Sequence, residues 1–321
     1  MNYNRFFLSA MIFTVILLST SLENALAQNT GEVAIPSSAA GTIEYIQKED
    51  FSFLNGKTGT VIFDRWEENN LKELTNVSCK CKVEKFVNCD SLNDSLAMLK
   101  TGKADFMLTT DITASYVAHR NPDLKAVIFD ISRAFTAEEL KAANAVAPVE
   151  PGDLAIVMTL RKSDAALRDS INAAIKKIKE NGTMAELENK WIKEMPAGSE
   201  PAGVAIDKIE KAETVYIGVS GDMPPLDYIA ADGKPAGYNV ALLAEISKLT
   251  GKNIEVISLD SKARFAALVS KKIDVFFWIV IPNDKFVQNQ LKENPDEKKF
   301  NEKFTITEPH CVVKTAFIMK K

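Results

Sequence analysis

Long uncharged runs are nearly absent from this 321-residue sequence. The one clear run, Phe6 to Leu18 after Arg5, is shorter than the roughly 20 apolar residues that a membrane-spanning helix needs. With the small residues Ala25 to Ala27, it has the order of a secretory signal that is cleaved before Gln28. The pattern therefore predicts an exported protein without a membrane span. No cysteine follows the run closely, so no lipid anchor is expected.

Histidine is equally scarce, because the chain contains only His119 and His310, in unrelated segments. Three of the four cysteines lie in the run SCKCKVEKFVNC, whose spacing fits none of the usual C-x₂₋₄-C zinc pairs. We therefore expect no metal, no cofactor and no Ser/His/Asp or Cys/His catalytic arrangement. One disulfide within Cys79 to Cys89 is the favoured pairing, although the sequence does not choose among the pairings that include Cys311.

A strong excess of charge is missing as well. The chain has 39 Lys and Arg against 43 Asp and Glu, a net charge of −4. Removal of the signal takes away one charge of each sign, Arg5 and Glu23, and leaves this value unchanged. A nucleic-acid partner is therefore excluded. A hydrophobic content of 46% suits a globular protein of one large or two small domains.

Two segments of the chain resemble each other in pattern. Ser91 to Asp111 combines a helical apolar face, a break at Gly102 and an apolar strand from Ala104 to Thr110. Ser261 to Ile281 repeats this order, with a helix face marked by Phe265, Leu268 and Val269 and a strand too apolar to be exposed on either side. Because each segment follows another strand, the sequence predicts two α/β lobes, each a sheet flanked by helices.

A different pattern separates these two segments. Asp164 to Trp191 has apolar residues at helical spacing, and Asn181 and Gly182 are expected to end a first helix before Thr183 caps a second. Pro196 to Gly203, PAGSEPAG, has the composition of a linker.

These residues also carry a family resemblance. GDMPPLDYIAADGKPAGYNVALLAEISKLTGKNIEVISL, followed by ALVSKKIDV, resembles the first lobe of bacterial extracellular solute-binding proteins, family 3, which serve polar amino-acid uptake. LNGKTGTVIFDRW and SLNDSLAMLKTGKADFMLTTDITASYVAHRNPDLKAV are similar to the second lobe. LAIVMTLRKSDAALRDSINAAIKKIKENGTMAELENKW resembles the closing strand and helices. The resemblance implies the two-lobed, type II periplasmic-binding-protein fold.

The order of these pieces differs from that of the family, because the second lobe precedes the first. A circular permutation explains an order in which each piece occurs once, because termini that lie close in space can be joined and new termini opened elsewhere. Two truncated domains in tandem are the rival explanation. The expected parts are a signal peptide (1–27), an N-terminal extension (28–50), the second lobe (51–130), the closing strand and helices (131–195), a linker (196–213) and the first lobe (214–321). A permuted chain of this kind is expected to be a monomer.

The resemblance further implies a ligand cleft between the lobes. Asp111, with its neighbour Thr110, stands where the family binds a ligand ammonium, although a helix cap is the alternative role of Asp111. The segment VIPNDKF has no arginine where the family usually has one. Lys285 or Arg65 would therefore face the carboxylate of the ligand. A surface position is the alternative for Arg65. Tyr228 lies near the family's stacking position. The implied ligand-binding residues are Asp111, Thr110, Arg65, Trp66, Tyr228, Trp278 and Lys285.

Some of these positions depart from the family pattern. Trp66 and Trp278 would suit a flat or cationic ligand, while Trp278 fits a core position equally well. Asn239 stands where the family often has an acid and is interpreted as a helix cap, and His310 stands where it often has tyrosine.

The function implied by the resemblance is capture of a small polar solute, an amino acid or a related compound, in the periplasm. The solute would pass to the membrane permease of an ABC transporter, without any chemistry. A sensor subunit for a membrane signalling partner is the alternative, and an enzyme similar to cyclohexadienyl dehydratases is a further one.

Overall fold

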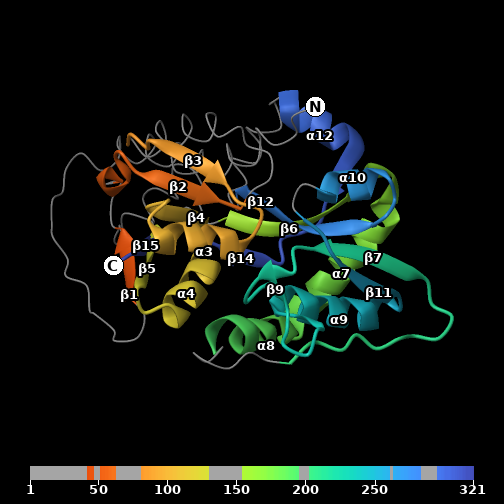
Figure 1. Cartoon of the computed structure of the whole chain (residues 1–321). Coiled ribbons are helices and arrows are strands. Elements are labelled where there is room, and N and C mark those ends of the chain that lie inside the picture. The colour runs from red at the N-terminus through yellow and green to blue at the C-terminus, as the bar shows by residue number, and fades with distance from the viewer. Residues whose placement is uncertain are drawn as a thin grey trace, which may run out of the picture.

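The computed structural model describes residues 42–46, 51–62, 81–129, 154–194, 202–260, 263–282 and 295–321. They form two lobes, each built on a six-stranded sheet with helices packed against it (Figure 1). The two-lobed α/β architecture that the sequence predicts is therefore confirmed. None of the helices in the described ranges combines the length and apolarity needed to cross a bilayer.

Sheet A forms the first of these lobes. Its strands lie in the order β1-β5-β15-β4-β2-β3, and β15 runs antiparallel to both of its neighbours. The helical segments of this lobe are η1 (Ser52–Leu54), α3 (Leu92–Thr101) and α4 (Asp111–Arg120). The strands are β1 (Thr42–Ile46), β2 (Thr58–Val61), β3 (Lys85–Asn88), β4 (Phe106–Thr110), β5 (Leu124–Phe129) and β15 (Thr315–Lys320).

Helix α3 ends at the break that the sequence predicts. The Ser91 side chain caps its start by accepting a hydrogen bond from Asp94 N at 3.0 Å. Gly102 ends it with φ 74°, a left-handed conformation that suits glycine. The local signals of this segment are thus sufficient to define the helix.

Sheet B forms the second lobe. Its strand order is β11-β7-β12-β6-β13, and β14 also pairs with β6. The apolar strand β12 is buried on both faces, as its composition predicts, because β7 and β6 flank it and helices cover the sheet. The strands are β6 (Leu154–Arg161), β7 (Thr214–Val219), β11 (Asn253–Ser258), β12 (Val275–Pro282), β13 (Phe304–Ile306) and β14 (Cys311–Val313).

A small three-stranded sheet, β8 (Asp222–Met223), β9 (Asp227–Ile229) and β10 (Pro235–Ala236), belongs to the same lobe. Helix α7 packs on sheet B through a buried stripe that includes Ile171 and Ile178, as its periodicity predicts. The other helical segments are η2 (Lys162–Asp164), α7 (Ala165–Glu180), α8 (Thr183–Glu188), the π-helical turn η3 (Asn189–Lys193), α9 (Tyr238–Thr250), α10 (Arg264–Val269) and α12 (Pro295–Lys303).

Two details of these helices differ from the prediction. The cap of α8 is Gly182 rather than Thr183, because Gly182 adopts φ 85° while the Asn181 side chain accepts a hydrogen bond from Thr183 N at 3.1 Å. Val269 is 62% exposed, whereas Phe265 and Leu268 are buried. Val269 ends α10, so its side chain lies beyond the face that packs on the sheet.

The cysteines also correct an expectation. Cys89 and Cys311 are free thiols, and Cys81 is buried. A disulfide between Cys89 and either Cys79 or Cys81 is therefore wrong. Cys79 lies outside the described residues.

Each sheet contains one strand from a distant part of the chain. Strand β6 follows the β1–β5 segment in sequence but lies in sheet B, and β15 follows the strands of sheet B but lies at the centre of sheet A. Lys314 alone separates β14 from β15, so the chain crosses between the lobes there. The predicted first lobe (214–321) thus includes a strand that pairs in the other sheet, because β15 completes the ladder between β4 and β5.

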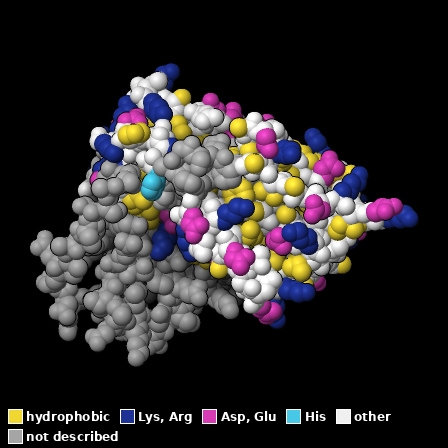
Figure 2. Space-filling model, turned by 90° about the horizontal axis from the view of Figure 1, so that it is seen from below, with side chains coloured by type: hydrophobic (Ala, Val, Ile, Leu, Met, Phe, Trp, Pro, Cys, Tyr) yellow, Lys and Arg dark blue, Asp and Glu magenta, His cyan; other side chains and the backbone are white. Residues whose placement is uncertain are grey.

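The surface of the described residues has a mixed charge. Seen from below, acidic and basic side chains are interspersed over the described face, with no large area of one sign (Figure 2). This distribution agrees with the small net charge of the sequence.

Candidate functional site

Asp111 lies where the two lobes meet. It is the first residue of α4, directly after β4. Its Oδ1 accepts a hydrogen bond from Lys314 N at 2.8 Å, and its own N donates to Lys314 O at 2.9 Å. Asp111 therefore holds the segment by which the chain crosses between lobes.

The cap of α4 is a different residue. Thr110 Oγ1 accepts from Thr113 N at 3.5 Å, and the Thr110 side chain is buried. The Asp111 carboxylate is consequently directed to the crossing segment, and the cap role that the sequence left open for it falls to Thr110.

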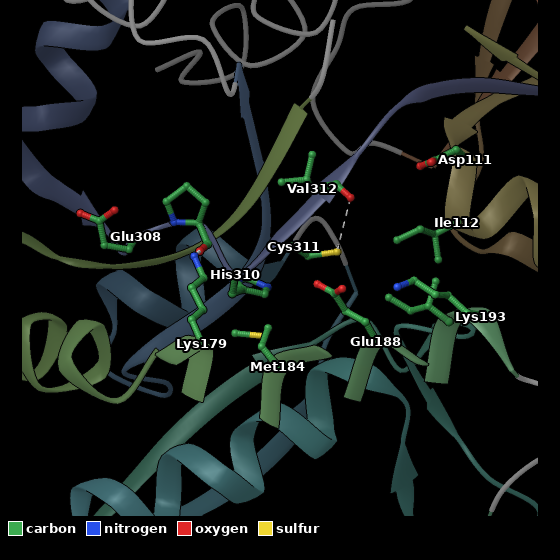
Figure 3. Close-up of a pocket in the computed structure, with 12 residues that line it drawn as sticks. Asp111, Ile112, Lys179, Met184, Glu188, Lys193, Glu308, His310, Cys311 and Val312 are labelled. Atoms are coloured by element: carbon green, nitrogen blue, oxygen red, sulfur yellow. Dashed lines mark hydrogen bonds between the residues drawn. The ribbon is translucent and has the colours of Figure 1, made fainter. Parts of the chain in front are cut away.

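A cavity of about 510 Å³ lies beside Asp111. Both lobes contribute to it: Asp111 and Ile112 come from α4, and the remaining residues come from α7, α8, η3, β14 and the segment that precedes β14 (Figure 3). The cavity is thus an interlobe site. Its lining consists of Asp111, Ile112, Lys179, Met184, Glu188, Ile192, Lys193, Glu308, Pro309, His310, Cys311 and Val312.

Two carboxylates approach the thiol of Cys311 in this cavity. The Glu188 side chain rises from α8 toward Cys311, and Asp111 lies on the side of α4 (Figure 3). Burial raises the pKa of the Cys311 thiol, and the negative charges of Asp111 and Glu188 raise it further. Cys311 is therefore a neutral, inert thiol, and the negative charge of this region belongs to the two carboxylates.

His310 forms a buried wall of the same cavity. Its side chain is 2% exposed and packs edge-on against Phe277, with ring centroids 5.1 Å apart. Burial lowers the pKa of His310 to about 3, and the charge of Lys179 contributes. The imidazole is thus neutral, and neither ring nitrogen has a hydrogen-bond partner among the described residues.

A second interlobe contact lies at the N-terminal end of α3. Asp222 Oδ2, in β8, accepts a hydrogen bond from Leu92 N, the first residue of α3, at 3.3 Å. Burial raises the pKa of Asp222, whereas the hydrogen bond from Leu92 opposes this shift. The carboxylate meets the positive end of a helix in the other lobe, which favours the approach of the two lobes.

Asn239 is not a helix cap, contrary to the sequence-based interpretation. Gly237, with φ 106°, precedes the first turn of α9. The fully buried Asn239 donates from Nδ2 to Asp227 Oδ2 at 2.8 Å, and Asp227 Oδ1 accepts from Gly221 N at 2.9 Å. Because a buried carboxylate requires such donors, Asn239 fixes the loop that carries Asp222.

The structure brings only part of the predicted ligand set together. Thr110 and Asp111 adjoin in the region of the cavity, whereas Tyr228 is 4% exposed in β9 of the other lobe. Trp278 lies in β12, but its side chain is outside the described residues. Arg65, Trp66 and Lys285 also lie outside them. The proposed roles of these residues stay predictions.

The sequence does not single out Glu188 or Asp222. Glu188 lies on an amphipathic closing helix, where a carboxylate is usually interpreted as surface, and Asp222 stands in a loop without a recognisable motif. Within the described ranges, no cluster of three His, Cys, Asp or Glu residues has the arrangement of a metal site.

Comparison with known proteins gives a family match over well over half of the chain. The family described as bacterial extracellular solute-binding proteins, family 3, matches residues 45–194 and 215–284. Both lobes are included in the matched residues.

Two curated relatives cover shorter parts. A "Probable amino-acid ABC transporter-binding protein" of Haemophilus influenzae is 26% identical over 109 residues, 34% of this chain and 37% of that protein. The "L-cystine-binding protein TcyJ" of Escherichia coli is 26% identical over 116 residues, 36% of this chain and 38% of that protein. The chain thus spans little more than a third of the length of either relative.

Solved structures give a distant likeness. The amino acid ABC transporter substrate-binding protein AbpA of Streptococcus pneumoniae, bound to L-arginine, is 11% identical with a TM-score of 0.33. That comparison covers 83% of this chain and 81% of the other.

Proposed function

This chain belongs to family 3 of the bacterial extracellular solute-binding proteins, and from that premise we propose that it captures a small polar solute between its lobes. The solute is an amino acid or a related compound, and the protein delivers it in the periplasm to an ABC transporter. The observation that carries this proposal is the Asp111 carboxylate, which lies beside an interlobe cavity at the point where the chain crosses between lobes.

Binding in this proposal is a closure of the two lobes. A solute that contacts both lobes shifts the population toward the closed arrangement, because only differential affinity moves such an equilibrium. Asp111 accepts the ammonium of the solute in a charge-assisted hydrogen bond. Arg65 or Lys285 meets its carboxylate, and the protein performs no chemical step.

We also propose that the chain is a circular permutant that works as a monomer. The positions of β6 in sheet B and β15 in sheet A support this proposal, since each sheet is completed by a strand of the same chain. If the chain were two truncated domains instead, a second copy of the chain would have to supply the strands at these positions of the sheets.

The test is Asp111→Ala, measured by calorimetry with a panel of L-amino acids. Loss of the carboxylate leaves a buried ammonium without its partner, which costs about 2 to 5 kcal/mol. The affinity is therefore expected to fall by roughly 30-fold to several thousand-fold. Asp123→Ala, which removes an exposed aspartate after α4, is the matched control and should leave the affinity unchanged.

Normal affinity with a lower melting temperature would overturn this role for Asp111 and assign its carboxylate to the contact with Lys314 alone. Arg65→Ala and Lys285→Ala, measured beside it, locate the carboxylate partner. If neither variant weakens binding, the solute has no carboxylate and the amino-acid assignment fails.

A further inference from the structure

The charged residues of the interlobe cavity are unequally paired. Asp111 accepts from Lys314 N, and Lys179 donates from Nζ to Pro309 O at 2.6 Å. Lys193 and Glu308 are exposed to solvent. Glu188 is partly buried, and its carboxylate has no hydrogen bond or ion pair within the part of the chain that the structure describes. Among the described charged residues that line the cavity, Glu188 is therefore the one that is partly buried without a hydrogen bond or ion pair.

Helix geometry explains why Glu188 faces the cavity. After α8 the chain continues as the π-helical turn η3, in which Glu194 N donates to Asn189 O at 2.7 Å. The π-helix repeats with i→i+5 hydrogen bonds, so residues five apart lie on nearly the same side. Glu188 and Lys193 both line the cavity, and Trp191 is the buried residue of the turn.

The cavity favours a positive group. Its lining contains three carboxylates, Asp111, Glu188 and Glu308, against the two lysines Lys179 and Lys193. A partly buried charge without a partner is unfavourable unless a cation or a hydrogen-bond donor meets it. The His310 ring, which is 2% exposed and unpartnered among the described residues, offers a further unmet polar group in the same wall.

We propose that Glu188 is a specificity-determining residue, which accepts a second cationic group of the solute and selects a dibasic amino acid. This inference rests on the proposed function, because Asp111 of one lobe holds the first ammonium. Glu188 of the other lobe then holds the second, so a dibasic solute contacts one carboxylate in each lobe. Such a solute favours closure more than a neutral amino acid of the same length.

The experiment compares L-lysine with L-norleucine, which has the same carbon chain without the terminal ammonium. Calorimetry is performed on the full-length protein, on Glu188→Gln and on Glu186→Gln, an exposed glutamate of α8 that does not line the cavity. Glu188→Gln is expected to weaken L-lysine binding by about 10-fold to 100-fold, the usual range for a hydrogen bond to a charged group. Binding of L-norleucine should change by less than about twofold, and Glu186→Gln should change neither.

The outcomes separate this inference from the proposed function. If both ligands weaken equally in Glu188→Gln, or if L-lysine binding is unchanged, Glu188 is not the selective residue although solute binding stands. If the unmodified protein binds neither probe but binds another, neutral amino acid, the dibasic assignment fails alone. If no amino acid of the panel binds, the proposed function and this inference fall together. Equal melting temperatures of Glu188→Gln and the unmodified protein exclude misfolding as the cause of a loss.

Discussion

At the scale of single residues, His310 shows how burial changes the chemistry of a side chain. The imidazole is enclosed between Phe277 and the cavity, and the Tyr238 hydroxyl donates to the His310 carbonyl at 2.6 Å. Its neutral form is the one that this environment tolerates, since protonation would place a charge in an apolar wall near Lys179. A buried histidine of this kind makes the stability of the fold dependent on pH.

His310→Phe should remove this dependence. The pKa of His310 in the folded protein is about 3, below its ordinary value of 6.5, so the unfolded chain binds a proton more readily. The contribution of His310 to stability is therefore present above pH 6.5 and is lost as the pH falls from 6.5 toward 3. Urea unfolding of both proteins across this range should show a smaller loss of stability for the variant.

His119→Gln serves as the control, because His119 is exposed on α4. Its pH profile should parallel that of the unmodified protein. Identical slopes for His310→Phe and the unmodified protein would contradict the assignment of the neutral, buried imidazole.

At the scale of elements, the contact between β8 and α3 joins the two lobes directly. Asp222 supplies an acceptor to the first N–H of a helix that belongs to the other sheet, in addition to the cap that Ser91 provides. Both lobes must be close for this hydrogen bond to form. In the closure that we propose, this contact would therefore favour the closed arrangement even without a solute.

Asp222→Ala is expected to shift the unliganded protein toward an open arrangement. A net hydrogen bond contributes about 1 kcal/mol, which corresponds to about a fivefold change in the ratio of closed to open molecules. Small-angle scattering should then give a larger radius of gyration for the variant. Asp260→Ala, at an exposed position after β11, should leave the radius unchanged, and an unchanged radius for Asp222→Ala would rule out a role of this contact in closure.

The elements that sequence reasoning located are those with strong local signals. Helix α3 has its cap and its terminal glycine, α7 has an apolar stripe, and β12 has a continuous apolar run. The cap of α8 was mispredicted because it depends on the backbone conformation of Gly182. The burial of Val269 was mispredicted because it depends on where α10 ends. The π-helical turn beside Glu188, whose buried residue is Trp191, has no local signal in the sequence.

The candidate site was less predictable than the fold, because most of its contacts have no local signal in the sequence. Asp111 was predicted because it follows a strand where the resembling family places an acid, and the structure places it in the lining of the interlobe cavity. Glu188 and Asp222 gain their importance from residues far away in sequence, Cys311 and Leu92, which no local pattern connects to them.

At the scale of the whole molecule, one apolar cluster extends through both lobes, and a second cluster lies in the lobe of sheet B. The first cluster includes Phe317 of sheet A and Ile217 of sheet B. Phe317 is 1% exposed and contacts Phe51, Phe53 and Phe106 through edge-on ring pairs. Because two strands are exchanged between the lobes, loss of packing in one lobe should be felt in the other.

Phe317→Ala is expected to destabilise the protein by about 3 to 5 kcal/mol, the usual cost of removing a buried aromatic ring. Thermal unfolding followed by far-ultraviolet circular dichroism and by tryptophan fluorescence should remain a single transition at a lower temperature, with coincident midpoints. Separation into two transitions, with only one shifted, would show that the lobes unfold independently.

The place of β15 has a consequence for biosynthesis. The ribosome makes β4 and β5 long before it makes residues 315–320, yet in the described sheet β15 is the strand that joins β4 to β5. During the interval each presents an open edge, and open strand edges recruit other extended chains. A nascent chain that stops short of β15 is therefore an aggregation hazard, and a chaperone that shields β4 and β5 until synthesis is complete would raise the yield of folded protein.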